Sequence, residues 1–258
     1  YQGSTRHGDQ RYQVQGVSRT QYLAAPYAQR ASYANAAQIN AVQAADDTLE
    51  YTGFLLDWNY LPGDTTPDWT YPVGSLSDQD RTPLEVILMI ARSAGAVLIP
   101  HRDADGWVLH PRLRSSPWDL DGAYMNAIVH YSQITSLGEQ YQPAPLYNAA
   151  YVSGVSFGQG VSVSRYFSGG NKPAPDLFSG EIVAVDQAKE RGRQIIANSG
   201  AHSLVTLTTA LPAASTAPGL IEPGDQLDYQ GQTETWRGYV LGISIRAPGS
   251  GAVNVNQT

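Results

Sequence analysis

The sequence predicts an α+β fold that is mainly β, with barrel-like β-domains and a small α/β insert. Most of residues 126–258 consists of short segments rich in Val, Tyr, Thr and Ser that Gly and Pro separate, the pattern of antiparallel strands. A strong helix-start signal near residue 82 is followed at once by a hairpin signal. With 258 residues, 42% of them hydrophobic, the chain can bury the core of one large β-rich domain or of two or three small ones.

The first 60 residues predict a strand, a helix and a second strand. Residues 11–21 place Tyr12, Val14 and a shifted Val17 among polar residues, which favours a half-buried strand kinked at Gly16. We expect residues 1–30 to be the end of a β-domain that begins before this chain. Residues 34–51, rich in Ala and Gln, predict an amphipathic helix that Gly53 ends, and residues 54–58 predict a buried strand.

The clearest local signal lies at residues 82–95. Thr82 is a capping hydroxyl, Pro83 stands at the first helical position and Glu85 at the third, so a capping box opens a helix that Gly95 ends. Residues 96–99 and 107–113 then predict two strands, with Asp105-Gly106 as a two-residue hairpin turn. Residues 31–125 are therefore expected to form the α/β insert domain.

The rest of the chain predicts mostly strands. Residues 126–185 are a β-rich segment, broken by glycines and prolines and including a loop at 168–175. Asp186 is expected to cap a helix over residues 187–198 that ends before Gly200. The strands expected after it are 205–211, 226–229, 235–246 and 252–256. Residues 186–258 are thus predicted to be a helix followed by a small β-barrel that is incomplete at its end.

Charge and composition exclude several classes of function. The formal net charge of −7 and a pI near 5.1 argue against a protein that grips nucleic acid, because that grip needs Lys and Arg on phosphates. An acidic surface suits a protein past which DNA slides. The chain has no cysteine, which excludes disulfides, thiol chemistry and cysteine-ligated zinc. No apolar run reaches eighteen residues, so membrane insertion is not expected.

Histidines and aspartates near the predicted hairpin are the candidates for a metal site. A two-residue turn would place His101 and His110 opposite each other, but two ligands alone do not make a zinc site, and a solvent-facing pair is the plainer interpretation. Asp103, Asp105 and Gly106 resemble the start of a calcium loop, yet the Glu that such a loop needs is absent, because position 112 is Arg. We therefore predict no metal and no cofactor.

Carboxylate pairs and aromatic residues are the candidates for an active site or a carbohydrate-binding site. A glycosidase needs two acids at a fixed separation. Two pairs are candidates, Asp46 with Asp47 and Asp119 with Asp121, but a role as surface or capping groups is the plainer interpretation of both. No nucleophile elbow, phosphate loop or dinucleotide motif occurs, and Gly154, Gly158 and Gly160 do not have the spacing. The aromatic candidates for a carbohydrate platform or protein interface are Trp58, Trp69, Trp107, Trp118 and Trp236, with the sixteen tyrosines. Core packing is the default role for each ring.

The order of segments resembles tail hub proteins of tailed bacteriophages, both the contractile-tail hub family and its siphophage counterparts. In that family a capped helix, an A-G-A turn and a hairpin ending in P-R recur, and residues 82–100 and 107–112 fit that pattern. The segments that fit the same order are residues 51–58, 191–197, 221–225 and 236–240. The likeness extends over about residues 11–258.

This resemblance implies a baseplate or tail-tip hub at the distal end of the virion tail, a structural protein without an active site. Such hubs form a ring, usually a trimer, that DNA passes through without being specifically bound. Their partners are further copies, the distal tail or tail-tube ring, the tape-measure protein and the fibre or receptor-binding proteins. A carbohydrate-binding β module is the alternative, and a glycoside hydrolase the third. Acids proposed to face the channel are Glu222, Asp225, Asp228 and Glu234, against Arg237 and Arg246 nearby.

Overall fold

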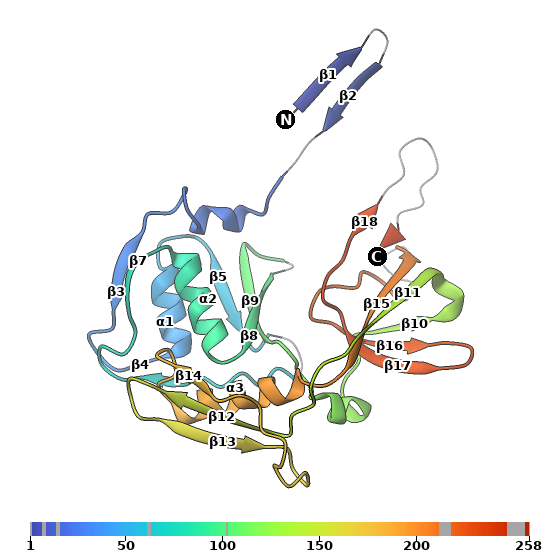
Figure 1. The fold of residues 1–258 in the computed structure, drawn as a ribbon. Coiled ribbons are helices and arrows are strands. Elements are labelled where there is room, and N and C mark those ends of the chain that lie inside the picture. Colours follow the sequence, from blue (N-terminus) through green and yellow to red (C-terminus); the bar gives the residue numbers. More distant parts are fainter. Residues whose placement is uncertain are drawn as a thin grey trace.

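The computed structural model describes residues 2–6, 9–13, 16–60, 63–101, 103–211, 218–246 and 256–257. These residues form several small sheets and three α-helices, so the predicted α+β, mainly β class is confirmed. Figure 1 shows an α/β body that contains the helices and a β body at the C-terminal end of the chain. No helix in the described ranges combines the length and apolar character needed to cross a membrane.

The first strands form a hairpin that stands away from both bodies (Figure 1). Strand β1 (Gln2–Arg6) pairs antiparallel with β2 (Asp9–Gln13). The continuous strand predicted over residues 11–21 is wrong, because β2 ends at Gln13 and η1 (Arg19–Leu23) is a 3-10 helix. The Ser18 hydroxyl accepts a hydrogen bond from the Thr20 amide and Leu23 is buried, which favours the helical turn. Val14 lies outside the described residues.

Two helices and a three-stranded sheet make the core of the α/β body. Helices α1 (Ala41–Leu49) and α2 (Pro83–Ser93) pack on each other. In the sheet, β9 (Gly106–Pro111) lies between β5 (Leu55–Trp58), to which it is parallel, and β8 (Ala96–Pro100), to which it is antiparallel. Central buried side chains are Ala44, Ile87, Ile90, Ala91 and Leu109. The helix and hairpin predicted for residues 82–113 are therefore present.

Two short strand pairs border this core. Strand β3 (Ala31–Ala34) pairs with β7 (Ser77–Arg81), and β4 (Ile39–Asn40) with β6 (Thr70–Tyr71). The helix predicted over residues 34–51 is thus shorter than expected. It begins after Asn40, whose side-chain oxygen accepts a hydrogen bond from the Gln43 amide at 2.8 Å, because the residues before it extend into strands.

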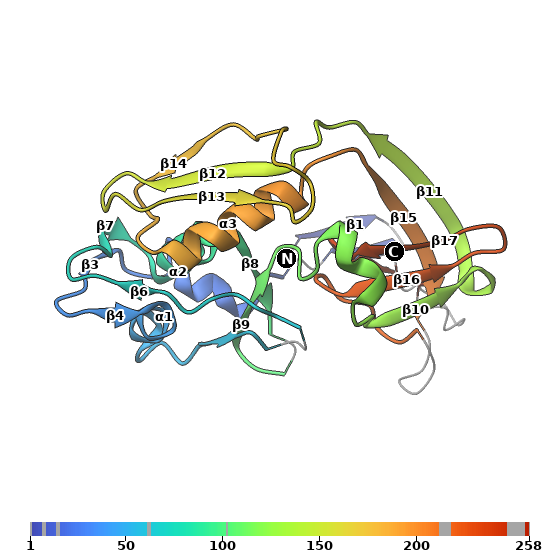
Figure 2. The same cartoon turned by 90° about the horizontal axis from the view of Figure 1, so that it is seen from below.

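The third helix carries a separate sheet on its outer side. Strand β12 (Ala149–Gly154) lies between β13 (Gly160–Ser164) and β14 (Leu177–Ser179), and α3 (Val185–Ala197) packs against β12 and β13. Figure 2 shows this sheet, α3 and then the other helices as successive layers. A Cβ at Gly192 would lie 2.6 Å from the Val163 side chain, so glycine is required for this close approach.

Asp186 is not the cap of α3, contrary to the prediction. The helix starts two residues earlier than predicted, and the Gln187 side-chain oxygen accepts from the backbone amides of Val183, at 2.8 Å, and Ala184. Asp186 is exposed and pairs with Lys189 at 3.2 Å. A buried glutamine that reaches back to two amides satisfies the free helix start as well as an aspartate cap would.

The β body holds two open sheets rather than the predicted barrel. In one, β16 (Gln226–Gln230) lies between β10 (Ala127–His130) and β17 (Thr235–Tyr239). The other has the order β11 (Ile134–Gln142), β15 (His202–Ala210), β19 (Asn256–Gln257) and β18 (Ile245–Arg246). Among the described residues the sheets share no strand, because η3 (Tyr131–Gln133) turns the chain between β10 and β11. They enclose a small core around Val129, Leu227 and Tyr229.

Candidate functional site

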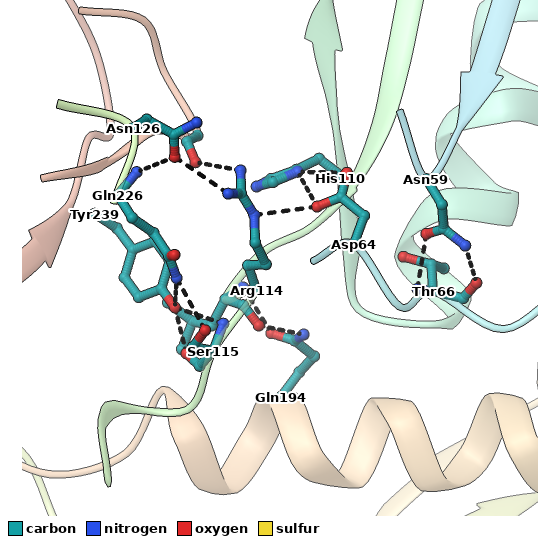
Figure 3. Close-up of polar contacts among 12 residues, drawn as sticks. Asn59, Asp64, Thr66, His110, Arg114, Ser115, Asn126, Gln194, Gln226 and Tyr239 are labelled. Carbon is teal, nitrogen blue, oxygen red and sulfur yellow. Dashed lines mark hydrogen bonds and ion pairs between the residues drawn. The ribbon is translucent and has the colours of Figure 1, made fainter. Parts of the chain in front are cut away.

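A buried cluster of polar side chains joins the two bodies, and we call it the polar junction (Figure 3). It surrounds residues 113–116, the stretch between β9 and η2 (Pro117–Gly122). Its members are Asp64, His110, Arg114, Ser115, Asn126, Gln226 and Tyr239. Of these residues, His110 is predicted only as a metal candidate and Tyr239 only as one of the sixteen tyrosines, so neither is predicted in this role.

Three ionisable side chains form the first half of the junction. Asp64, His110 and Arg114 have side chains that are 0%, 1% and 2% exposed. The His110 Nδ1 atom lies 3.0 Å from the Asp64 carboxylate, and the Arg114 Nε atom lies 3.2 Å from the same oxygen. Figure 3 shows Arg114 lying between this pair on one side and Asn126 on the other. A buried carboxylate needs such partners, because an unpaired charge in the interior costs on the order of several kcal/mol.

Arg114 and its neighbours then bind the β body. The Arg114 guanidinium donates to the Asn126 side-chain oxygen at 3.1 Å and to the Gly224 carbonyl at 3.4 Å. The Asn126 oxygen also accepts from the Gln226 amide at 3.0 Å, where β16 begins.

The second half of the junction is a ring of neutral hydrogen bonds. The Gln226 side chain donates to the Tyr239 hydroxyl at 2.8 Å and to the Ser115 hydroxyl at 3.1 Å. The Tyr239 hydroxyl accepts from the Ser115 amide and donates to the Ser115 carbonyl. Strands β16 and β17 are thereby attached to residue 115.

Helix α3 is attached to the same stretch from the other side. The Leu113 amide donates to the Gln194 side-chain oxygen at 3.1 Å, and the Leu113 carbonyl accepts from Gln194 and from Arg193. Arg193 is itself held by Glu190 at 2.6 Å. Three parts of the chain that lie far apart in sequence thus converge on residues 113–115.

The Asp64–His110 pair resembles half of a hydrolytic triad, but its surroundings do not suit catalysis. A catalytic histidine needs a hydroxyl or thiol within reach of its second nitrogen and a route for substrate. Within the described ranges the His110 Nε2 atom is buried without a hydrogen-bond partner, and a Cβ at Gly224 would lie 3.4 Å from it. The arrangement supports a structural role, which is to fix the two bodies to each other.

The predicted facing of His101 and His110 is wrong. Strand pairing places Val97 opposite His110, and the His101 amide donates to the Gly106 carbonyl, so His101 lies across from Gly106 instead. His101 pairs with Asp57 at 2.9 Å instead. The candidate calcium residues are also engaged otherwise, since Asp105 pairs with Arg19 and the Asp103 amide donates to His101. Over the residues that the structure describes, no three His, Asp or Glu side chains gather as metal ligands.

The two carboxylate pairs lie on the surface. Asp46 and Asp47 are exposed neighbours on α1, and partial burial together with the Asp47 charge raises the pKa of Asp46. Asp121 lies 3.4 Å from Arg237, beside the exposed Asp119 on η2.

The four acids proposed for the channel differ in their surroundings. The Asp225 carboxylate accepts from the Glu222 amide at 2.8 Å and so closes the turn before β16. Asp228 accepts from Gln230 at 3.0 Å and from Arg237 at 3.1 Å, and these hydrogen bonds lower its pKa although burial opposes them. Glu234 is exposed at the β16–β17 turn, and Glu222 is half-buried. The Arg246 side chain lies outside the described residues.

The five tryptophans pack against other groups. Trp69 and Trp107 are buried in the α/β core, and Trp58 stacks on Trp69 with ring centroids 5.6 Å apart. Trp236 lies against Tyr229, and the Arg165 guanidinium lies over Trp118. They do not form the exposed row that a carbohydrate platform requires.

Strands β11 and β15 form an exposed two-stranded ribbon on the β body. The two strands pair from Ile134 opposite Thr209 to Gln142 opposite His202, and β11 is the edge strand of its sheet in the described part of the chain. Leu137 is 44% exposed and Tyr141 66% exposed on β11. Figure 2 shows the ribbon curving along the outer side of the β body. Long exposed edge strands can accept another strand, so this ribbon is a candidate assembly surface.

No family model matches the sequence, and no curated protein is similar to it. Solved structures with a similar fold include two tail proteins. One is a tail protein from Neisseria meningitidis, 10% identical with a TM-score of 0.52, and the likeness covers 86% of this chain and 67% of that one. The other is a 43 kDa tail protein of prophage MuSo2 from Shewanella oneidensis, 14% identical with a TM-score of 0.57, covering 94% of this chain and 72% of that one.

Proposed function

We propose that this chain is a structural subunit of a bacteriophage tail, and more narrowly of the hub at the tail tip or baseplate. In this role it forms a ring, a trimer in the simplest case, that closes or extends the tail tube, anchors fibres and lets DNA pass. The observation that carries the proposal is the shared fold, over 86% and 94% of the chain, with two tail proteins, the second of them from a prophage.

The arrangement of charges and surfaces supports an assembly role. The chain holds its two bodies together through a buried polar junction, as a rigid building block requires. Its formal net charge of −7 suits a conduit that phosphate does not adhere to. The ribbon of β11 and β15 presents apolar side chains to solvent, which suits contact with another protein.

The partners in this proposal are further copies of the chain, the distal tail or tail-tube ring, the tape-measure protein and the fibre or receptor-binding proteins. DNA passes through without being specifically bound. We also propose that the chain is not an enzyme, since the buried Asp64–His110 pair has neither a nucleophile nor access for substrate among the residues that the structure describes. If the chain hydrolysed peptidoglycan, and substitution of a single Asp or Glu abolished this activity, the proposal that it is not an enzyme would be contradicted.

Immunolabelling of intact virions tests the location. An antibody against this chain, bound to particles and viewed by negative-stain electron microscopy, is expected to mark the distal end of the tail. An antibody against the capsid protein is the control for labelling efficiency. Label on the head or along the tube would overturn the hub assignment, and its absence from virions would overturn the tail assignment as well.

A further inference from the structure

The loop between β13 and β14 presents two aromatic rings to solvent, and we call residues 165–172 the aromatic loop. Tyr166 is 81% exposed and Phe167 is 93% exposed. Their ring centroids lie 4.0 Å apart with the planes tilted by 46°. Figure 1 shows this part of the chain projecting beyond α3. Most exposed apolar residues on a protein occur singly, so two exposed rings in contact with each other indicate a contact surface.

The backbone of the aromatic loop is strained where it presents these rings. Phe167 has a φ of 59°, in the left-handed region that bulky side chains rarely adopt. Glycine would adopt this conformation without cost, and glycines do occupy the next left-handed positions, Gly169 and Gly170. A phenylalanine held there, with its ring in water, destabilises the isolated chain, which favours a role for that ring in binding.

Asn148 holds both ends of the aromatic loop. Its carbonyl accepts from the Arg165 amide at 2.9 Å, and its side-chain oxygen accepts from the Lys172 amide at 2.7 Å. Its side-chain nitrogen donates to the Ser168 carbonyl at 3.0 Å and to Asn171 at 2.9 Å. The Arg165 guanidinium lies 4.6 Å from the centre of the Trp118 ring, which fixes one flank. The rings are therefore pre-organised, and pre-organisation lowers the entropy lost on binding.

A complementary surface lies on the other body of the same chain. Leu137, Glu139 and Tyr141 alternate along β11 and so share one face of the ribbon, with Val205 directly opposite Glu139. In the described part of the chain no cationic side chain pairs with the Glu139 carboxylate. The aromatic loop carries the opposite charge, because Arg165 and Lys172 are both exposed.

We propose that the aromatic loop of one copy binds the β11–β15 ribbon of a second copy. Tyr166 and Phe167 then lie against Leu137 and Tyr141, and Lys172 lies beside Glu139. The two surfaces belong to different bodies, so the contact is head to tail, and such contacts form a ring when the rotation between successive copies closes. This inference rests on the proposed function and names the surfaces by which its subunits meet.

Sedimentation equilibrium of the chain tests the loop. The wild-type chain is expected to self-associate reversibly, and changing Tyr166→Ala together with Phe167→Gly should raise the dissociation constant at least about 100-fold, as loss of two central anchors does. Phe178→Ala is the matched control. Phe178 is also exposed, at 62%, but it has an ordinary backbone conformation on β14, and its loss should change the constant by less than about threefold.

Charge reversal tests the receiving surface. Lys172→Glu and Glu139→Lys should each weaken association about tenfold, and the two together should restore it. Association that the loop variant leaves intact overturns the aromatic loop as the contact, and a double reversal without recovery overturns the ribbon. A wild-type chain that stays monomeric overturns the whole inference. Labelling of virions decides the proposed function separately, so the two failures are distinguishable.

Discussion

Arg114 illustrates how one side chain can fix the relation of two bodies. It neutralises Asp64 in the α/β body and binds Asn126 and Gly224 in the β body. None of these contacts is visible in the sequence, because Asp64 and Gly224 lie 50 and 110 positions from Arg114 and no motif links them. An arginine suits the position because its planar guanidinium offers several donors in fixed directions.

Arg114→Met should destabilise the folded chain by about 3–5 kcal/mol, because the change keeps an unbranched apolar stem but removes the cation beside the buried Asp64 carboxylate. Urea unfolding followed by tryptophan fluorescence measures this. Arg112→Met is the control, since Arg112 is exposed, and it should alter stability by no more than about 0.5 kcal/mol. Equal stabilities for the two variants would contradict a structural role for the junction.

Asp228 gives a prediction for pH. Hydrogen bonds from Gln230 and then Arg237 lower its pKa in the folded chain, against the effect of burial. A carboxyl group whose folded pKa is depressed stabilises the fold above its unfolded pKa, near 3.9, and this stabilisation is lost as the pH falls through the folded value. Asp228→Asn should therefore lower the melting temperature at neutral pH and have little effect at about pH 2. If the variant and the wild-type chain differed in melting temperature by the same amount at both pH values, the predicted role of the ionised Asp228 carboxylate would be contradicted.

At the scale of elements, local chemistry decided which predictions held. Helix α2 was predicted because its signal is complete within four residues: the Thr82 hydroxyl accepts from the Glu85 amide, and the Glu85 carboxylate accepts from the Thr82 amide at 2.8 Å. The β8–β9 turn was predicted but its register was not. The pairing of β9 with β5 and the observed register of β8 on β9 depend on tertiary contacts that an Asp-Gly pair does not determine.

The candidate site was predictable only in part, for the same reason. His110 was singled out, yet its partner is Asp64 rather than His101, because the partner comes from a loop that has no pattern of its own. The prediction of a closed barrel is wrong, because alternation along a strand indicates which side chains share a face but not which strands pair with each other.

Thr82→Ala should reduce stability by about 1 kcal/mol, because it leaves the Glu85 amide at the start of α2 without its acceptor. Thr82→Ser retains the hydroxyl and is the control. Urea unfolding of both variants measures the difference. If the alanine variant were as stable as the serine variant, the capping box would contribute nothing that solvent cannot replace.

At the scale of the whole molecule, the two bodies divide the work that a tail subunit would need. The α/β body and its outer sheet contain the larger core and the aromatic loop, whereas the β body contains the ribbon and the four acids proposed for the channel. A fixed junction between them sets where these surfaces point, so a ring built from such subunits would inherit its geometry from residues 113–115.

The four acids are not equivalent in this arrangement, and this gives the last prediction. Asp225 closes a turn and Asp228 pairs with Arg237, so both carboxylates are used within the chain. Glu234 is exposed at the β16–β17 turn and is the acid best placed to face a channel.

In a phage that carries this protein, Glu234→Lys should slow DNA ejection, because a cation at the channel wall would hold passing phosphates. Real-time ejection from purified virions measures the rate, with Asp119→Lys, another exposed acid but on η2, as the control. An unchanged rate in the Glu234 variant, with normal particle assembly, would mean that this end of the β body does not face the path of the DNA.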